Sequence, residues 1–197
     1  YFIYMGNSKT NRRNDFNRLE LVEVINHKND FKGLKTFIEE HGGLDSVDEF
    51  GRTALINCII AFRNPIEDCC SANDYAKLLV ESGADVNKTD FNGYVALHHC
   101  ILSKNYEMFD YLLSRPNINI DVEPGLLGYA LSHDIDNTSN IIKLLDLGLD
   151  PFKKGTIFST YQVLVGIDNG TIKIGNQTKS VKPVLDHIKQ LYADRVE

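Results

Sequence analysis

Five short segments of this sequence share one apolar pattern, and their spacing limits the folds that the chain can adopt. In each, a Leu or similar residue is followed by two variable residues, a small or apolar residue and a large aliphatic residue. The segments start at Leu21, Leu55, Leu97, Leu127 and, with a weaker match, Tyr161. Successive starts differ by 34, 42, 30 and 34 residues. Apolar residues at i, i+3 and i+4 share one helical face, so each segment predicts a short amphipathic helix.

A second helix is expected after each of these segments, because an apolar pair and a turn follow at a regular distance. The pairs are Phe37-Ile38, Leu78-Leu79, Leu112-Leu113, Leu144-Leu145 and Val184-Leu185. Gly43, Gly83 and Gly148 follow three of them at positions typical of a helix C-terminus with positive φ. Repetition of two helices and a turn predicts an all-α solenoid, in which stacked units bury a common core.

Two central units resemble the ankyrin repeat family. Residues 90–100, DFNGYVALHHC, resemble the family block D-x-x-G-x-T-P-L-H-x-A, and residues 78–87, LLVESGADVN, resemble L-L-x-x-G-A-D-V-N. Residues 48–55, DEFGRTAL, are a second copy of the first block, whereas the fourth unit lacks the D-x-x-G motif and the fifth depends on its helix pattern. The resemblance implies about five units, at residues 18–47, 48–89, 90–122, 123–154 and 155–197, after an N-terminal tail at 1–17.

Two departures from the regular period predict local excursions. The 42-residue spacing leaves about nine extra residues in the second unit, which we place in a projecting loop at residues 63–73. In the fifth unit, alternating apolar and polar residues around Asn169-Gly170 predict a small hairpin or extended excursion over 168–176. A final helix is expected at about 180–193.

The residues that could support chemistry do not form a recognisable site. Zinc needs four converging ligands, usually at short spacings, and the chain's four cysteines (58, 69, 70 and 100) with His98 and His99 do not show such spacing. The resemblance instead implies that Cys58 and Cys100 occupy small core positions and that His98 is a structural residue. No nucleophile elbow or phosphate-binding glycine loop is present. We therefore expect no enzyme activity, no cofactor and no metal.

Composition and charge limit the partners. The formal charge of −6 argues against nucleic acid as the main partner, and no apolar run is long enough to span a membrane. Four irregularly spaced cysteines do not make a disulfide framework, so we expect a cytoplasmic protein, monomeric when free. Residues 101–150 carry 8 acidic and 3 basic residues, and an acidic surface of this kind attracts a basic partner.

The resemblance implies that the first helices line a concave face and that finger-like turns project beside it. The third residue of each first-helix pattern, namely Glu23, Asn57, His99, Tyr129 or Val163, is expected to point into the groove. On the fingers and the acidic surface we expect partner contacts at Phe50, Arg52, Phe91, Asn92, Tyr94 and Glu123. Aromatic and Arg side chains are frequent interface anchors, although repeated finger residues can equally pack on one another.

The sequence therefore predicts a non-catalytic protein-binding module that holds a partner through its concave face and fingers. An alternative is an inhibitor, similar in role to bacterial immunity proteins, that neutralises a basic, nuclease-type toxin. An enzyme or a cofactor-bound protein built on the solenoid is a third hypothesis, from a different class.

Overall fold

The computed structural model describes residues 38, 43–61, 71–153, 158–174 and 180–196. This part contains eight α-helices and one short 3-10 helix at its C-terminal end. The helices are α3 (Ala54–Ala61), α4 (Ala72–Glu81), α5 (Ala96–Ser103), α6 (Tyr106–Leu113), α7 (Leu126–His133), α8 (Thr138–Asp146), α9 (Thr160–Asp168) and α10 (Lys182–Leu191), followed by η2 (Ala193–Arg195). Within these residues the only β-type pairing is an isolated bridge between Val47 and Thr53, which confirms the all-α expectation.

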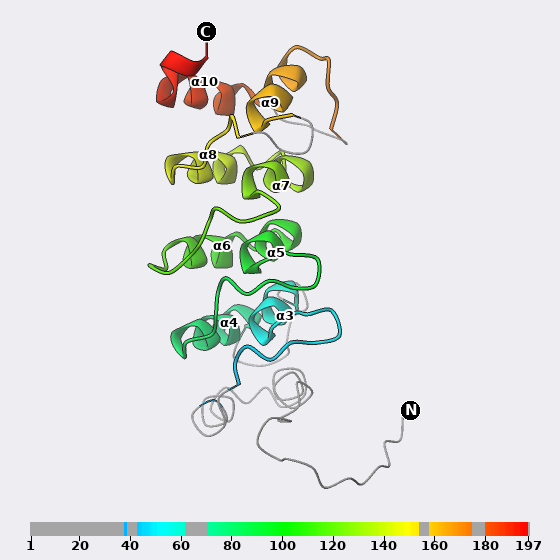
Figure 1. Cartoon of the computed structure of the whole chain (residues 1–197), viewed down its shortest axis with the longest axis vertical. Helices are drawn as coiled ribbons and strands as arrows, with labels where there is room; N and C mark the ends of the chain where they lie inside the picture. The colour runs from blue at the N-terminus through cyan, green and yellow to red at the C-terminus, as the bar shows by residue number, and fades with distance from the viewer. Residues whose placement is uncertain (1–37, 39–42, 62–70, 154–157, 175–179, 197) are drawn as a thin grey trace, which may run out of the picture.

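The helices form two parallel rows, so the described part is a solenoid (Figure 1). One row holds α3, α5, α7 and α9, and the other holds α4, α6, α8 and α10. Helix α3 packs against α4 and α5, α5 packs against α6 and α7, and α7 packs against α8 and α9. Each first helix therefore contacts its own second helix and the first helix of the next unit.

The core between the rows is continuous and follows the predicted pattern. In α5, the pattern residues Leu97, Cys100 and Ile101 are almost fully buried, as are Leu55, Cys58 and Ile59 at the same positions of α3. The buried residues of all units belong to one cluster that runs from Ile38 to Ile188. The i, i+3, i+4 spacing thus identified the buried face of the first helices correctly.

The glycine turns close the second helices as expected. Gly83, with φ +97°, donates its N–H to Val80 O at 3.1 Å, and Ala84 N donates to Leu79 O at 3.0 Å. These two bonds form a Schellman C-cap, which needs a residue with positive φ. Gly148, with φ +95°, ends α8 in the same way.

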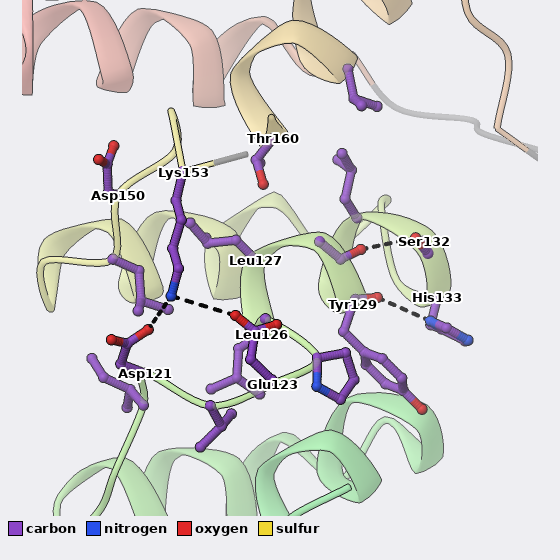
Figure 2. Close-up of a pocket in the computed structure, with 18 of the residues that line it drawn as sticks. Asp121, Glu123, Leu126, Leu127, Tyr129, Ser132, His133, Asp150, Lys153 and Thr160 are labelled. Atoms are coloured by element: carbon purple, nitrogen blue, oxygen red, sulfur yellow. Dashed lines mark hydrogen bonds and ion pairs between the residues drawn. The ribbon is translucent and has the colours of Figure 1, made fainter. Parts of the chain in front are cut away.

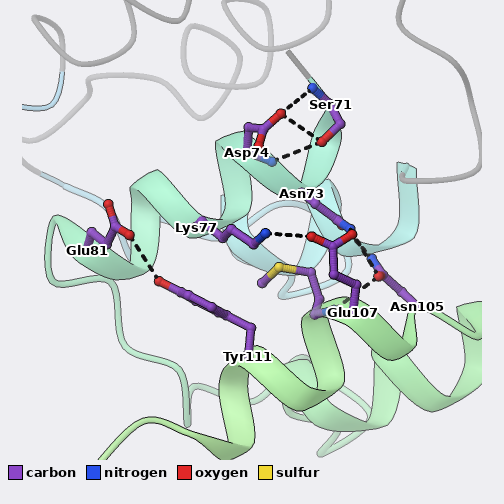
Figure 3. A network of polar contacts seen from close by, with 9 residues as sticks. Ser71, Asn73, Asp74, Lys77, Glu81, Asn105, Glu107 and Tyr111 are labelled. Carbon is purple, nitrogen blue, oxygen red and sulfur yellow. Dashed lines mark hydrogen bonds and ion pairs between the residues drawn. The ribbon is translucent and has the colours of Figure 1, made fainter.

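Polar contacts join successive second helices in the row that holds α4, α6, α8 and α10 (Figure 3). Asn73 of α4 and Asn105, which caps α6, exchange side-chain hydrogen bonds of 3.3 and 2.8 Å in a buried position. Lys77 donates to Glu107 at 2.5 Å, and Lys143 of α8 donates to Asp110 of α6 at 2.6 Å. These contacts align each second helix with the next one.

The predicted loop at 63–73 ends earlier than expected. Residues 62–70 lie outside the described part, but Ala72 and Asn73 belong to α4. Ser71 caps this helix, because its Oγ accepts from Asp74 N at 3.3 Å while Asp74 Oδ2 accepts from Ser71 N at 2.7 Å. The S-x-x-D spacing is a capping box, and it marks the helix start that the loop prediction missed.

The predicted hairpin or extended excursion at 168–176 is described only as far as residue 174, where it is irregular. Asp168 ends α9, and residues 171–174 form no strand; residues 175–179 lie outside the described part. Ile172 N donates to Gly166 O at 2.9 Å, and the Ile172 side chain fills the space beside Gly166. Residues 171–174 therefore fold back onto α9.

Several expectations concern residues beyond the described ranges. The tail at 1–17, Glu23 and most of the first unit lie there, as do Cys69 and Cys70. Within the described ranges, none of the helices combines the length and apolar character needed to cross a bilayer. The unit boundaries remain a prediction.

Candidate functional site

Two fingers precede α3 and α5, and a buried or half-buried aspartate organises each. Asp48 Oδ1 accepts from the backbone N–H groups of Phe50 and Arg52 at 2.8 and 2.9 Å. Asp90 Oδ1 accepts in the same way from Asn92 and Tyr94 at 2.8 and 3.0 Å. Both fingers therefore have the same tight turn, held by a side-chain acceptor.

The third pattern residue of the following helix completes each finger. Asn57 Nδ2 donates to Asp48 Oδ2 at 3.2 Å, and His99 Nε2 lies 3.0 Å from Asp90 Oδ2. His99 is only 4% exposed, so the expectation that it points into an open groove is wrong. Its position in the helix is the one we expected, but the adjacent aspartate binds it within the chain.

Burial and hydrogen bonding set the charge states of this pair. Burial opposes ionisation of Asp90, but the hydrogen bonds from Tyr94, Asn92 and His99 outweigh it, so the pKa of Asp90 lies below its ordinary value. Burial lowers the pKa of His99, and the nearby charge of Arg52 lowers it further, against the opposing effect of Asp90. Neutral pH therefore leaves Asp90 ionised and His99 mainly neutral.

His98 is a structural residue, as the resemblance implied. Its Nδ1 accepts from Val95 N at 3.1 Å, so the ring proton lies on Nε2, which donates to Pro124 O at 2.7 Å. The first bond satisfies an N–H at the start of α5, and the second joins α5 to the turn before α7. Burial lowers the pKa of His98, which keeps this neutral tautomer in place.

Tyr129 occupies the third pattern position in α7, and the fourth unit has no finger aspartate. It is 7% exposed and stacks on His133, with ring centroids 4.1 Å apart. Tyr94 and His98 approach its ring edge-on at 5.1 and 4.8 Å. Tyr129 is therefore largely buried, although it is one of the residues that line the groove described below, and burial raises its pKa to about 12.

The finger tips, in contrast, expose apolar side chains. Phe50 and Phe91 are 51% and 74% exposed, and Asn92 is exposed beside Phe91. The half-buried Arg52 guanidinium lies over the Phe50 ring, 4.8 Å from its centroid. We call Phe50, Arg52, Phe91 and Asn92 the finger surface.

The two fingers are joined to one another. Phe91 N donates to Phe50 O at 3.1 Å, and the Cα of Gly51 lies so close to Phe91 that a Cβ there would come within 2.6 Å of Phe91 N. Gly51 also has φ +75°, which glycine adopts without strain. The finger residues thus pack on one another and remain exposed at the same time.

Helices α3 and α5 each add one exposed apolar residue that our sequence analysis missed. Ile60 of α3 and Leu102 of α5 are 37% and 52% exposed. Each follows the third pattern position by three residues, so it lies on the same helical face one turn later. The sequence signal for both residues was an apolar side chain at a helix position outside the i, i+3, i+4 pattern.

A groove of about 960 Å³ lies along α7 (Figure 2). Its walls are α7, the segment before it, the turn after α8, and residues of α9 including Thr160 and Val163. Lys153 crosses the opening and binds Asp121 at 2.8 Å and Glu123 at 3.5 Å. The exposed Glu123, a predicted contact residue, is therefore paired within the chain.

The same pairing extends to most of the acidic segment at 101–150. Six of its eight acidic residues form an ion pair with a lysine or arginine: Glu107, Asp110, Asp121, Glu123, Asp134 and Asp150. Asp146 lies 2.7 Å from His187. The acidic excess read from this segment is thus partly neutralised by basic residues from other units.

The family model for ankyrin repeats matches residues 21–123 in three copies, a range that includes both fingers. This range is more than half of the chain. The chain belongs to the ankyrin repeat family. Ankyrin repeats generally mediate protein–protein interaction, so the coarse function is that of a protein-binding fold.

Individual relatives match only over short ankyrin segments. Inversin from Homo sapiens is 42% identical over 71 residues, and Inversin from Danio rerio is 39% identical over 82 residues. An ankyrin repeat protein of Acanthamoeba polyphaga mimivirus is 41% identical over 39 residues. These matches cover 36%, 42% and 20% of this chain, and the chain spans 5–7% of the length of the relatives.

The cysteines of this ankyrin protein lie in its core where the structure describes them. Cys58 and Cys100 are free and buried at equivalent positions of α3 and α5. Burial raises the pKa of Cys58 to about 12 and that of Cys100 further, so both remain protonated thiols. The described residues contain no group of three or more His, Cys, Asp or Glu side chains arranged for a metal ion.

Proposed function

We propose that this chain is a non-catalytic module that binds a partner protein through the finger surface and the exposed face of α3 and α5. The exposure of Phe50 and Phe91 on two joined fingers carries the proposal. Burying a Phe side chain stabilises a complex by about 1.5–3 kcal/mol. Because the turns are already fixed by Asp48 and Asp90, little conformational entropy is lost when a partner covers them.

Ile60 and Leu102 extend the candidate surface from the fingers onto the concave helices. Beneath this surface, the side chains of Asn57 and His99 contact the finger aspartates, and Tyr94 packs against Tyr129. A direct role for these four residues in partner contact remains a prediction. Solenoids commonly bind through such extended concave surfaces.

The proposal is tested with a partner recovered by affinity purification on the full chain. Phe50→Ala and Phe91→Ala are each expected to weaken binding about tenfold or more, chiefly through faster dissociation. Leu191→Ala is the matched control, because Leu191 is 45% exposed on α10, away from the fingers. Equal affinities of the wild-type and Phe variants would reject the finger surface as the binding site.

The alternative function, inhibition of a basic toxin, depends on the acidic segment at 101–150. Its support is the formal charge of the chain, −6, while the ion pairs described above reduce the field that this segment presents. Under this alternative, Glu123→Gln and added salt slow association with the partner, whereas binding through the finger aromatics depends little on either.

We place this function in the cytoplasm, with the chain monomeric when free. The free thiols of Cys58 and Cys100 are consistent with a reducing compartment. Size-exclusion chromatography with light scattering tests the monomer, and fluorescence microscopy of the tagged chain tests the compartment.

A further inference from the structure

Within the finger surface, Arg52 is the residue whose position is not explained by its contacts within the chain. Its Nε is buried without a hydrogen-bond partner among the described residues. A partly buried cation that lacks an acceptor loses hydration without compensation. The position is therefore costly for the isolated chain. Because Nε is shielded from solvent, an external acceptor would bind the remaining N–H groups of this half-buried side chain.

One carboxylate of the same finger is already engaged. Asp48 uses Oδ1 for the backbone N–H groups of Phe50 and Arg52, and Oδ2 for Asn57. These bonds fix the backbone of Arg52 without accepting from its guanidinium. The charge of Arg52 is still felt by its neighbours, because it contributes to lowering the pKa of His99.

The guanidinium is also held in place by an aromatic ring. It lies 4.8 Å from the centroid of Phe50, a cation–π contact. Stacking orients a guanidinium and leaves its N–H groups available for a planar acceptor such as a carboxylate. The joined finger places the Phe91 side chain, 74% exposed, next to Gly51.

We propose that the finger surface recognises a partner segment in which an Asp or Glu side chain neighbours a large apolar side chain. The carboxylate binds Arg52, and the apolar side chain packs on Phe50 and Phe91. This inference rests on the proposed function and specifies the partner's chemistry. It assigns an acidic contact to the fingers, in contrast to the basic partner that the acidic segment suggested.

The test selects binders to the full chain from phage-displayed random peptides, with fixed sequences at both ends of the random region so that only side chains supply carboxylates. We expect enriched peptides to combine Asp or Glu with an aromatic or large aliphatic residue. Their affinity should fall about tenfold or more for Arg52→Gln, and by a similar factor when the peptide acid is replaced by its amide. Arg52→Lys should restore only part of the affinity, because Lys lacks the bidentate geometry.

Controls separate this inference from the proposed function. Leu191→Ala should bind as the wild type does. Arg52→Gln should keep the wild-type circular dichroism spectrum and melt at the same temperature or higher, because the substitution removes an N–H without an acceptor. Peptides without an acidic residue, whose affinity falls for Phe91→Ala but not for Arg52→Gln, would overturn the inference and remain compatible with the proposed function. Peptides whose affinity is unchanged by both Phe91→Ala and Arg52→Gln would count against the inference and against the proposed function. An empty selection, or enrichment only from a second library with a free C-terminal carboxylate, would also overturn the inference.

Discussion

At the residue scale, the buried histidines make the stability of this protein depend on pH. Burial lowers the pKa of His98 and His99 below the ordinary value of 6.5, so near pH 6 the unfolded chain binds protons that the folded chain does not. Stability is therefore complete above about pH 6.5 and decreases as the pH falls through that value. Asp90 adds to the loss only at much lower pH, because its pKa lies below 3.8.

We expect the melting temperature to fall between about pH 7 and pH 5, and to fall less in His99→Gln. Gln can donate to Asp90 but does not titrate, so the variant removes one of the two protonation sites. Differential scanning calorimetry over this pH range measures both effects. A melting temperature that does not change with pH, or the same decrease in the variant, would contradict the assignment.

Two glycines allow the cost of positive φ to be separated from the contact between the fingers. Gly83 has φ +97° and open space where a Cβ would lie, so Gly83→Ala should cost about 1 kcal/mol from backbone strain alone. Gly51 has φ +75° and is in close contact with the Phe91 backbone, so Gly51→Ala should cost about 2 kcal/mol or more. Urea unfolding of both variants measures the loss of unfolding free energy. Equal losses would show that the contact between the fingers adds nothing to stability.

At the element scale, the start of α6 depends on Asn105. Its Oδ1 accepts from Met108 N at 3.3 Å, and its Nδ2 donates to the buried Asn73 of α4 at 2.8 Å. Asn105→Ala removes the cap and leaves the Asn73 carbonyl without this donor, so a loss of about 2 kcal/mol or more is expected in urea unfolding. Lys77→Ala is the control, because the Lys77–Glu107 pair is exposed and should contribute about 0.5 kcal/mol. The reverse order would mean that the exposed pair, not the buried amides, holds α4 and α6 together.

At the scale of the whole molecule, stability should be transmitted between neighbouring units only. Leu97 of α5 is fully buried, and α5 packs against α3, α6 and α7. Leu97→Ala, at a cost of about 3 kcal/mol, should therefore speed amide hydrogen exchange in the units on both sides. Leu185→Ala in α10 should affect mainly α8 to α10, since α10 packs against α8 and α9. Identical exchange patterns for the two variants would indicate a single cooperative unit instead of an array.

The buried face and the turns could be predicted because they depend on nearby residues. The apolar spacing of Leu97, Cys100 and Ile101 determines one helical face, and Gly83 and Gly148 determine where helices end. The helix start at Ser71 was also readable from its capping box, although we assigned those residues to a loop. Alternation predicted an excursion after α9, but not the contact of Ile172 with Gly166, because that contact depends on how the segment folds back onto the helix.

The candidate site was predicted in part. Sequence identified the finger residues, including Phe50 and Phe91, but could not tell whether repeated aromatics pack or protrude, and here they do both. It placed His99 and Tyr129 on the correct helices but did not show how far their side chains are buried. Their burial depends on Asp90 in one case and on His133, Tyr94 and His98 in the other.

The sequence by itself therefore determined the repeat, its helices and its turns, because periodicity and capping act over a few residues. Only the tertiary structure decided which polar residues are used within the chain and which remain for a partner. Asn57 and His99 bind finger aspartates, most acidic residues of 101–150 pair with bases from other units, and Arg52 stacks on Phe50 without an acceptor. Many of these contacts join residues about 30 positions apart, such as Asp110 and Lys143, and arise only when the units stack in register.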